Sequence, residues 1–136
     1  MARWIASSIV DLPAVSDGEI DDPVWYPLQH ALGIETFGAN VFVAQHDEQL
    51  VVEEHDERES GQQELYVLLA GSAVFELDGE EARLERGDVL AVTDPAVVRR
   101  GTALTAGTVL LVAGASDRPF ESSWNPAHFE GIPRPG

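Results

Sequence analysis

The stretch ELYVLLAGSAVFELDGEEARLERGDV, residues 64–89, decides the fold. It holds short runs of strand length at 65–70, 73–77 and 82–84, separated by turn signals. Asp78-Gly79 is a two-residue turn of the kind that joins antiparallel strands, since glycine accepts a positive φ. Gly71 and Gly87 mark further reversals. The stretch therefore predicts consecutive antiparallel strands.

Similar runs continue on both sides of this stretch, at 41–44, 50–54, 89–92, 97–100 and 108–113. About eight strands with no long helix between them favour an antiparallel sandwich or barrel over alternating strands and helices. One short helix is expected before the barrel, with Asp22 as its cap, Pro23 or Pro27 at its start and Gly33 at its end. We therefore expect an all-β fold with one short N-terminal helix.

The whole chain, 1–136, is expected to form a single domain, because its length falls in the usual range for one core. The core barrel should cover about 37–114. Residues 1–36 should supply an N-terminal strand and the short helix, and 115–136 a C-terminal strap anchored by Phe120 and Trp124.

Composition excludes several classes of function. Twenty-four acidic residues against eight basic ones give a net charge of −16, the wrong sign for nucleic acid or an anionic membrane surface. The chain has no cysteine, which removes disulfides, thiolate metal sites and cysteine nucleophiles. No apolar run is long enough to span a bilayer, so we expect a cytoplasmic protein.

Residues 55–100 resemble the cupin superfamily both in the spacing of the motif residues and in the pattern of apolar residues between them. Glu64, six residues and Gly71 reproduce the glutamate-six-glycine element of the first cupin motif. Gly87-Asp88-Val89 is similar to the start of the second motif. The resemblance implies a cupin-type β-barrel, also called a double-stranded β-helix or jelly roll, with room for a small molecule inside.

The resemblance also implies a metal site, from which this chain departs. Metal-binding cupins use two histidines and a glutamate of the first motif and a histidine of the second. If the pair begins at His55, Glu57 stands where its second histidine would be. If the family's usual shorter gap before Glu64 is kept, the pair falls at Glu57 and Glu59 or at Arg58 and Ser60, with no histidine in register. Counting from Gly87 puts Thr93, Pro95 and Val98 at the family's proline, glycine and histidine positions. A valine cannot donate a lone pair, so the usual four-ligand site is not expected.

A partial set of donors remains in His55, Glu57 and Glu64. One imidazole and two carboxylates can bind Mn, Fe or Zn when waters complete the shell. An exposed position for His55 on a hairpin, or a role for it in a metal-free pocket, are open alternatives.

Glu64 opens a strand that is apolar on both faces, so a buried Glu64 needs a cation, a hydrogen-bond donor or a proton. Arg99 and Arg100 are the candidate cations, and successive residues of a strand point to opposite faces. If Val98 faces the cavity as the family spacing implies, Arg100 is the better inward residue. Tyr66 shares the parity of Glu64. The expected ligand-binding set is therefore Glu64, Tyr66, Val98 and Arg100.

Three functions follow as hypotheses. The first is a small-molecule-binding barrel that lacks the usual metal site and acts as a sensor, a carrier or an enzyme. The second is a divalent-metal enzyme of the dioxygenase, isomerase or decarboxylase kind, with His55, Glu57 and Glu64 as ligands. The third is a non-enzymatic dimerisation module. A homodimer is expected in any case, because the strand 65–69 has an outer apolar face that needs a cover.

Overall fold

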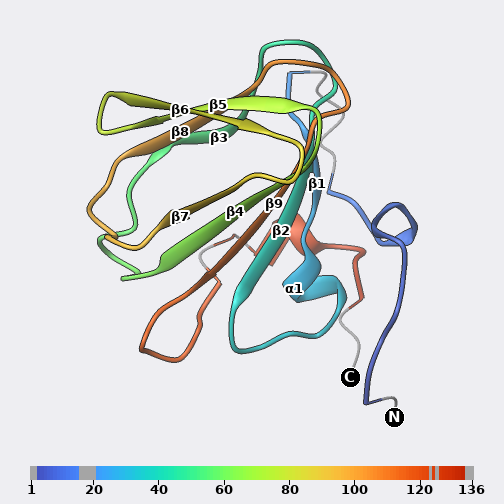
Figure 1. Ribbon diagram of the computed structural model, residues 1–136. Coiled ribbons are helices and arrows are strands. Elements are labelled where there is room, and N and C mark those ends of the chain that lie inside the picture. Colours follow the sequence, from blue (N-terminus) through green and yellow to red (C-terminus); the bar gives the residue numbers. More distant parts are fainter. Residues whose placement is uncertain (1–2, 16–20, 123, 125, 134–136) are drawn as a thin grey trace.

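Two antiparallel sheets face each other across the core of the molecule (Figure 1). The computed structural model describes residues 3–15, 21–122, 124 and 126–133. One sheet has five strands in the order β1-β2-β9-β4-β7, and the other has four in the order β3-β8-β5-β6. The strands are β1 (Val24–Tyr26), β2 (Gly38–Val43), β3 (Gln49–His55), β4 (Gln63–Ala70), β5 (Ser72–Leu77), β6 (Glu80–Glu85), β7 (Val89–Val92), β8 (Arg99–Ala103) and β9 (Val109–Ala115).

The expected all-β architecture is confirmed, and each of the eight expected strands has a counterpart. The short helix α1 (Leu28–Ala31) follows Pro27, so Pro27 rather than Pro23 marks its start. Residues after Pro23 instead form β1, which pairs with β2, because Val, Trp and Tyr favour extended backbone. Two short 3-10 turns, η1 (Ile9–Asp11) and η2 (Pro126–Phe129), complete the described elements. No described helix combines the length and apolarity that crossing a membrane requires.

The core lies between the inner faces of the two sheets. Alternate residues of β4, Tyr66 and Leu68, are fully buried there, as are Ala73 and Phe75 of β5 and Leu110 of β9. This period of two is the pattern of a strand with one face on a core. The same parity places Glu64, at the start of β4, on the inner face.

Gly71 permits the reversal from β4 to β5. Its φ is +78°, a conformation that side chains with a Cβ rarely adopt. A Cβ at this position would also collide with the Thr108 hydroxyl oxygen, which accepts from the Ser72 backbone N–H. The glycine of the cupin-like first motif is therefore required by both backbone angle and space.

The outer face of β4, which points away from the core, is partly exposed to solvent in the single chain. Leu65 and Leu69 point away from the core and remain exposed, as does Val89 of β7. Helix α1 packs against β2, which is separated from β4 by β9 in the order of the sheet (Figure 1). The homodimer that the apolar outer face suggested therefore stays a prediction.

Candidate active site

Glu64 lies at the centre of a cluster of polar side chains between the two sheets. Its side chain is only 10% exposed. Its Oε1 atom accepts a hydrogen bond from the Tyr66 hydroxyl at 2.7 Å and another from Arg99 Nη1, also at 2.7 Å. The prediction that Glu64 faces inward, with Tyr66 on the same face, agrees with this arrangement. A buried carboxylate is thus supplied with both a donor and a cation, as its burial requires.

The inward arginine is Arg99, and the expectation that Arg100 faces the cavity is wrong. The Arg99 side chain is 0% exposed, whereas that of Arg100 is 46% exposed and lies 4.0 Å from Glu76. Val98 is also absent from the described pocket lining, and it is Val97, which shares the parity of Arg99, that packs against the core. Counting along the family motif therefore assigned the wrong parity to this strand.

The reason for the shifted parity lies in the turn before β8. Val97 N–H donates to the Asp94 carbonyl at 3.2 Å, closing a turn over residues 94–97. Arg99 fastens this turn, since its Nε and Nη2 donate to the Val97 carbonyl at 3.1 and 2.8 Å. Arg99 Nη2 also reaches the Pro95 carbonyl at 3.4 Å. The guanidinium therefore joins the turn to Glu64 across the barrel.

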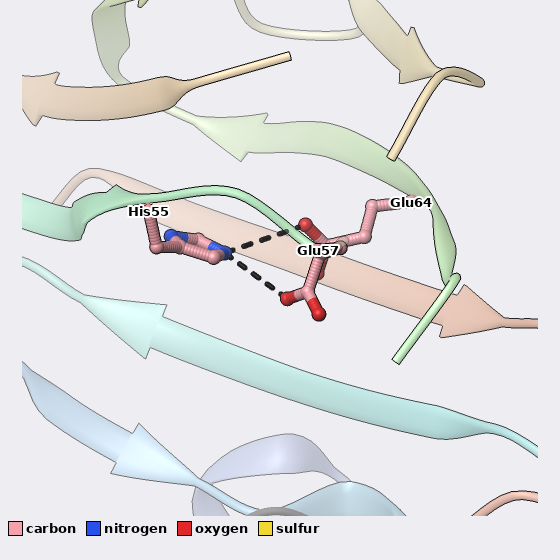
Figure 2. A group of neighbouring side chains, drawn as sticks. All are labelled: His55, Glu57 and Glu64. Carbon is pink, nitrogen blue, oxygen red and sulfur yellow. Dashed lines mark ion pairs between the residues drawn. The ribbon is translucent and has the colours of Figure 1, made fainter. Parts of the chain in front are cut away.

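His55 and Glu57 complete the cluster from the end of β3 and the loop after it (Figure 2). His55 Nε2 points toward both carboxylates, 3.2 Å from Glu57 Oε1 and 3.6 Å from Glu64 Oε1. Its Nδ1 lies 2.7 Å from the Glu53 carbonyl oxygen, a contact that places a proton on Nδ1. Glu57 is held by its own loop, because its Oε2 accepts from the Ser60 hydroxyl at 2.5 Å.

The neighbours shift the protonation of all three central groups. Hydrogen bonding to Glu57, and then to Glu64, raises the pKa of His55 to about 10, so the ring is an imidazolium at neutral pH. Burial by itself raises the pKa of Glu64, but hydrogen bonds from His55, Tyr66 and Arg99 outweigh it and leave the pKa below its usual value. Burial, and then the charge of Glu64, raise the pKa of Tyr66, which stays a neutral donor.

A pocket of about 590 Å³ opens beside this cluster, within the size range of small-molecule sites. His55, Glu57, Glu64 and Tyr66 line one part of it. Aromatic side chains from the N-terminal strand, β2 and the C-terminal segment line another: Trp25, Phe42, Phe120 and Trp124. Trp124 packs on Trp25 with ring centroids 4.3 Å apart, which agrees with the expected anchoring of the C-terminal strap.

The donor atoms of His55, Glu57 and Glu64 lie within 4.8 Å of one another and could hold an ion. The His55 Nδ1 contact to a backbone carbonyl is also typical of metal-ligating histidines. However, Glu64 Oε1 already accepts two short hydrogen bonds, one of them from a buried guanidinium. These residues therefore do not match the set of three histidines and one glutamate that the cupin resemblance implies.

Solved structures identify the class of fold. KdgF from Halomonas sp. is 17% identical over 87% of this chain and 96% of its own, with a TM-score of 0.64. A cupin protein from Bacteroides fragilis is 20% identical over 91% and 93%, with a TM-score of 0.61. A cupin-superfamily sugar phosphate isomerase from Silicibacter pomeroyi is 19% identical over 82% and 73%, also at 0.61.

No protein-family model and no curated protein matches the sequence. The chain has the cupin fold, as the spacing of Glu64, Gly71 and Gly87 predicted. At these identities the likeness extends to the fold and not to a substrate.

The structure adds two residues to the site that the expected set does not contain, Arg99 and Trp25. A sequence signal for Arg99 is that Gly101 and Ala103, small buried residues, share its parity on β8. A signal for Trp25 is that the run Val24–Tyr26 is rich in strand-forming residues. Its indole N–H donates to Asn40 Oδ1 at 2.7 Å, which fixes the ring at the pocket wall.

Proposed function

We propose that this protein is a small-molecule-binding barrel whose polar centre works without a metal ion. The observation that carries the proposal is the fully buried Arg99, which donates to Glu64 and supplies a positive charge beside this carboxylate. At neutral pH two positive groups, Arg99 and protonated His55, face two carboxylates, Glu57 and Glu64. The cluster is thus neutral in charge and all of its buried polar atoms have partners.

The pocket beside the cluster supports a binding role. Its mixture of aromatic walls and a few fixed polar groups is typical of small-molecule sites. A filled interior would favour a module that serves only for dimerisation. The pocket of about 590 Å³ argues against that function.

The test is binding of a panel of small fragments to chelator-treated protein, followed through the indole N–H resonances of its tryptophans. Trp25 and Trp124 line the pocket, whereas Trp4 is 78% exposed and lies outside it. Binding in the pocket should shift the Trp25 and Trp124 signals and leave that of Trp4 unchanged.

A blocking variant makes this test specific. Ser122 is an exposed lining residue, so Ser122→Trp should fill the mouth and abolish the shifts. Thr36→Trp, at an exposed position outside the described pocket lining, is the matched control. A panel that shifts no pocket resonance, or shifts that survive Ser122→Trp, would overturn the proposed function.

A second candidate function is a metal-dependent enzyme that uses Mn, Fe or Zn. It is favoured by the spacing of the three donors and by the His55 Nδ1 contact. His55, Glu57 and Glu64 would hold the ion, which would supply Lewis-acid or redox chemistry. Replacing His55 and Glu64 together should then abolish the metal content, and unchanged content would remove this candidate.

A further inference from the structure

Resting on the proposed binding role of the pocket, we propose that it selects an organic cation: a protonated amine carried on an aromatic or other apolar body. The charge and the ring composition of the pocket wall carry this inference. It names a class of ligand, which the cupin fold alone does not.

The charged wall of the pocket is almost entirely acidic. Six carboxylate residues line it among the described residues: Asp21, Asp22, Glu53, Glu54, Glu57 and Glu64. The chain has no lysine, and none of its arginines is among the described lining residues. The histidines His55 and His128 are the basic side chains there. A phosphorylated or carboxylate ligand would therefore meet charge of its own sign with no arginine fork or lysine to hold it.

The inner carboxylates already have nitrogen groups beside them. His55 Nε2 lies 3.2 Å from Glu57 and 3.6 Å from Glu64, and Arg99 Nη1 lies 2.7 Å from Glu64. Glu57 is the more accessible of the two carboxylates, with 20% of its side chain exposed, and both of its oxygens can accept more than one hydrogen bond. An ammonium group with its three donors can therefore bind Glu57 from the pocket side while His55 stays in place.

Arg99 cannot act as an anion-binding residue for the pocket. Its Nη1 donates to Glu64, and its Nε and Nη2 donate to the Val97 carbonyl. The side chain is fully buried behind Glu64. Its charge is therefore neutralised inside the protein, and the excess acidic charge remains with the pocket wall.

The aromatic part of the wall suits the body of such a ligand and adds to the selection for positive charge. Ring faces carry a negative electrostatic potential that attracts ammonium groups. Trp25 packs against both Phe42 and Trp124, with ring centroids 6.4 and 4.3 Å from theirs. The pocket thus combines aromatic rings in one part with carboxylates in another, and both kinds of group attract organic cations.

The experiment compares three probes with the same phenyl body: phenethylamine, phenethyl alcohol and phenylacetate. Titrations of the full chain at neutral pH and low salt should give an affinity for the amine about tenfold above that for the alcohol, with no measurable binding of the anion. Added salt should weaken binding of the amine and leave that of the alcohol unchanged.

Charge variants locate the selection. Glu57→Gln should lower the affinity for the amine about tenfold and leave that for the alcohol unchanged. Glu54→Gln, at an exposed lining position outside the buried cluster, should lower it by a smaller factor. Glu81→Gln, exposed on β6 and absent from the described lining, makes the same change in net charge and should have no effect.

Equal affinities for the three probes, or tighter binding of phenylacetate, would overturn the selection for cations and leave the small-molecule role standing. Failure of all three to bind would also overturn it, and the fragment panel would then decide separately whether the pocket binds small molecules. An equal loss of amine affinity in Glu57→Gln and Glu81→Gln would show a general charge effect and contradict the assigned site.

Discussion

Two neighbouring arginines of β8 give opposite examples of what an ion pair does in this protein. Arg99 belongs to the inner cluster, which we define as His55, Glu57, Glu64, Tyr66 and Arg99. Arg100 belongs to the outer pair that it forms with Glu76 on the other face of the same sheet. The inner arginine is fully buried and donates to Glu64 at 2.7 Å, whereas the outer one is half exposed, at 4.0 Å from its partner.

The difference shows that burial, and not residue type, decides how much an ion pair contributes to the free energy of unfolding. An exposed pair is screened by water and salt and contributes little to stability. A buried charge that loses its partner keeps its desolvation penalty. The inner cluster should therefore tolerate few substitutions, while the outer pair should tolerate most.

The largest expected effect comes from removing the buried cation. Arg99→Met removes the guanidinium that binds Glu64 and the hydrogen bonds from it to the turn at 94–97. The change should therefore destabilise the fold by about 3–5 kcal/mol. Arg100→Met, the neighbouring change on the outer face, should cost less than about 0.5 kcal/mol. Urea unfolding of both variants checks this, and similar costs for the two would break the comparison.

The next effect comes from neutralising the buried acid. Glu64→Gln keeps the shape of the side chain but leaves Arg99 facing a neutral amide, so it should cost about 2–3 kcal/mol. Glu76→Gln on the outer face is the matched control and should stay near zero. If Glu64→Gln instead stabilised the protein, the desolvation penalty of the buried carboxylate would have to exceed the stabilisation from its hydrogen bonds, which would contradict the account.

A smaller loss is expected from the tyrosine. Tyr66→Phe removes the hydroxyl that donates to Glu64 at 2.7 Å and should cost about 1.5 kcal/mol. In the Glu64→Gln background the same change should cost less, because a bond to a charged acceptor has already been weakened. A double-mutant cycle by urea unfolding measures this coupling, and additive costs would show that the Tyr66 hydroxyl does not act through Glu64.

The smallest effect should appear as a dependence of stability on pH. The pKa of His55 rises from 6.5 to about 10 on folding, so its contribution is fully present below 6.5 and is lost as the pH rises through about 10. The melting temperature should therefore fall between neutral pH and about pH 11. The chain has neither lysine nor cysteine, which leaves few other groups titrating there.

His55→Gln supplies the control for this pH effect. It should flatten the melting temperature over that range, because the titrating ring has been removed. The same fall in wild type and His55→Gln would assign the effect to other groups.

The barrel could be predicted from the sequence because its signals are local. Asp78-Gly79 and Gly71 both have positive φ at the reversals that the sequence indicated. Strand parity likewise placed Glu64 and Tyr66 on one inner face. Such features depend on a residue and its immediate neighbours, so a single sequence carries them.

The partner of Glu64 could not be predicted with the same certainty because it depends on a turn. One residue more or less in the turn before β8 exchanges Arg99 and Arg100 between the two faces. The bond between Asp94 and Val97 is local, but the pairing of Val98 with Asp78 joins residues 20 apart in the chain and forms only on folding. The acidic aromatic pocket similarly joins β1, β2 and the C-terminal segment, which are distant in sequence.

The central claim is that the protein itself supplies the positive charge beside Glu64. Elemental analysis of protein purified without a histidine tag tests it most directly. We predict Mn, Fe and Zn contents well below one equivalent per chain. About one equivalent of a single metal that resists mild chelation and disappears when His55 and Glu64 are replaced would contradict the claim.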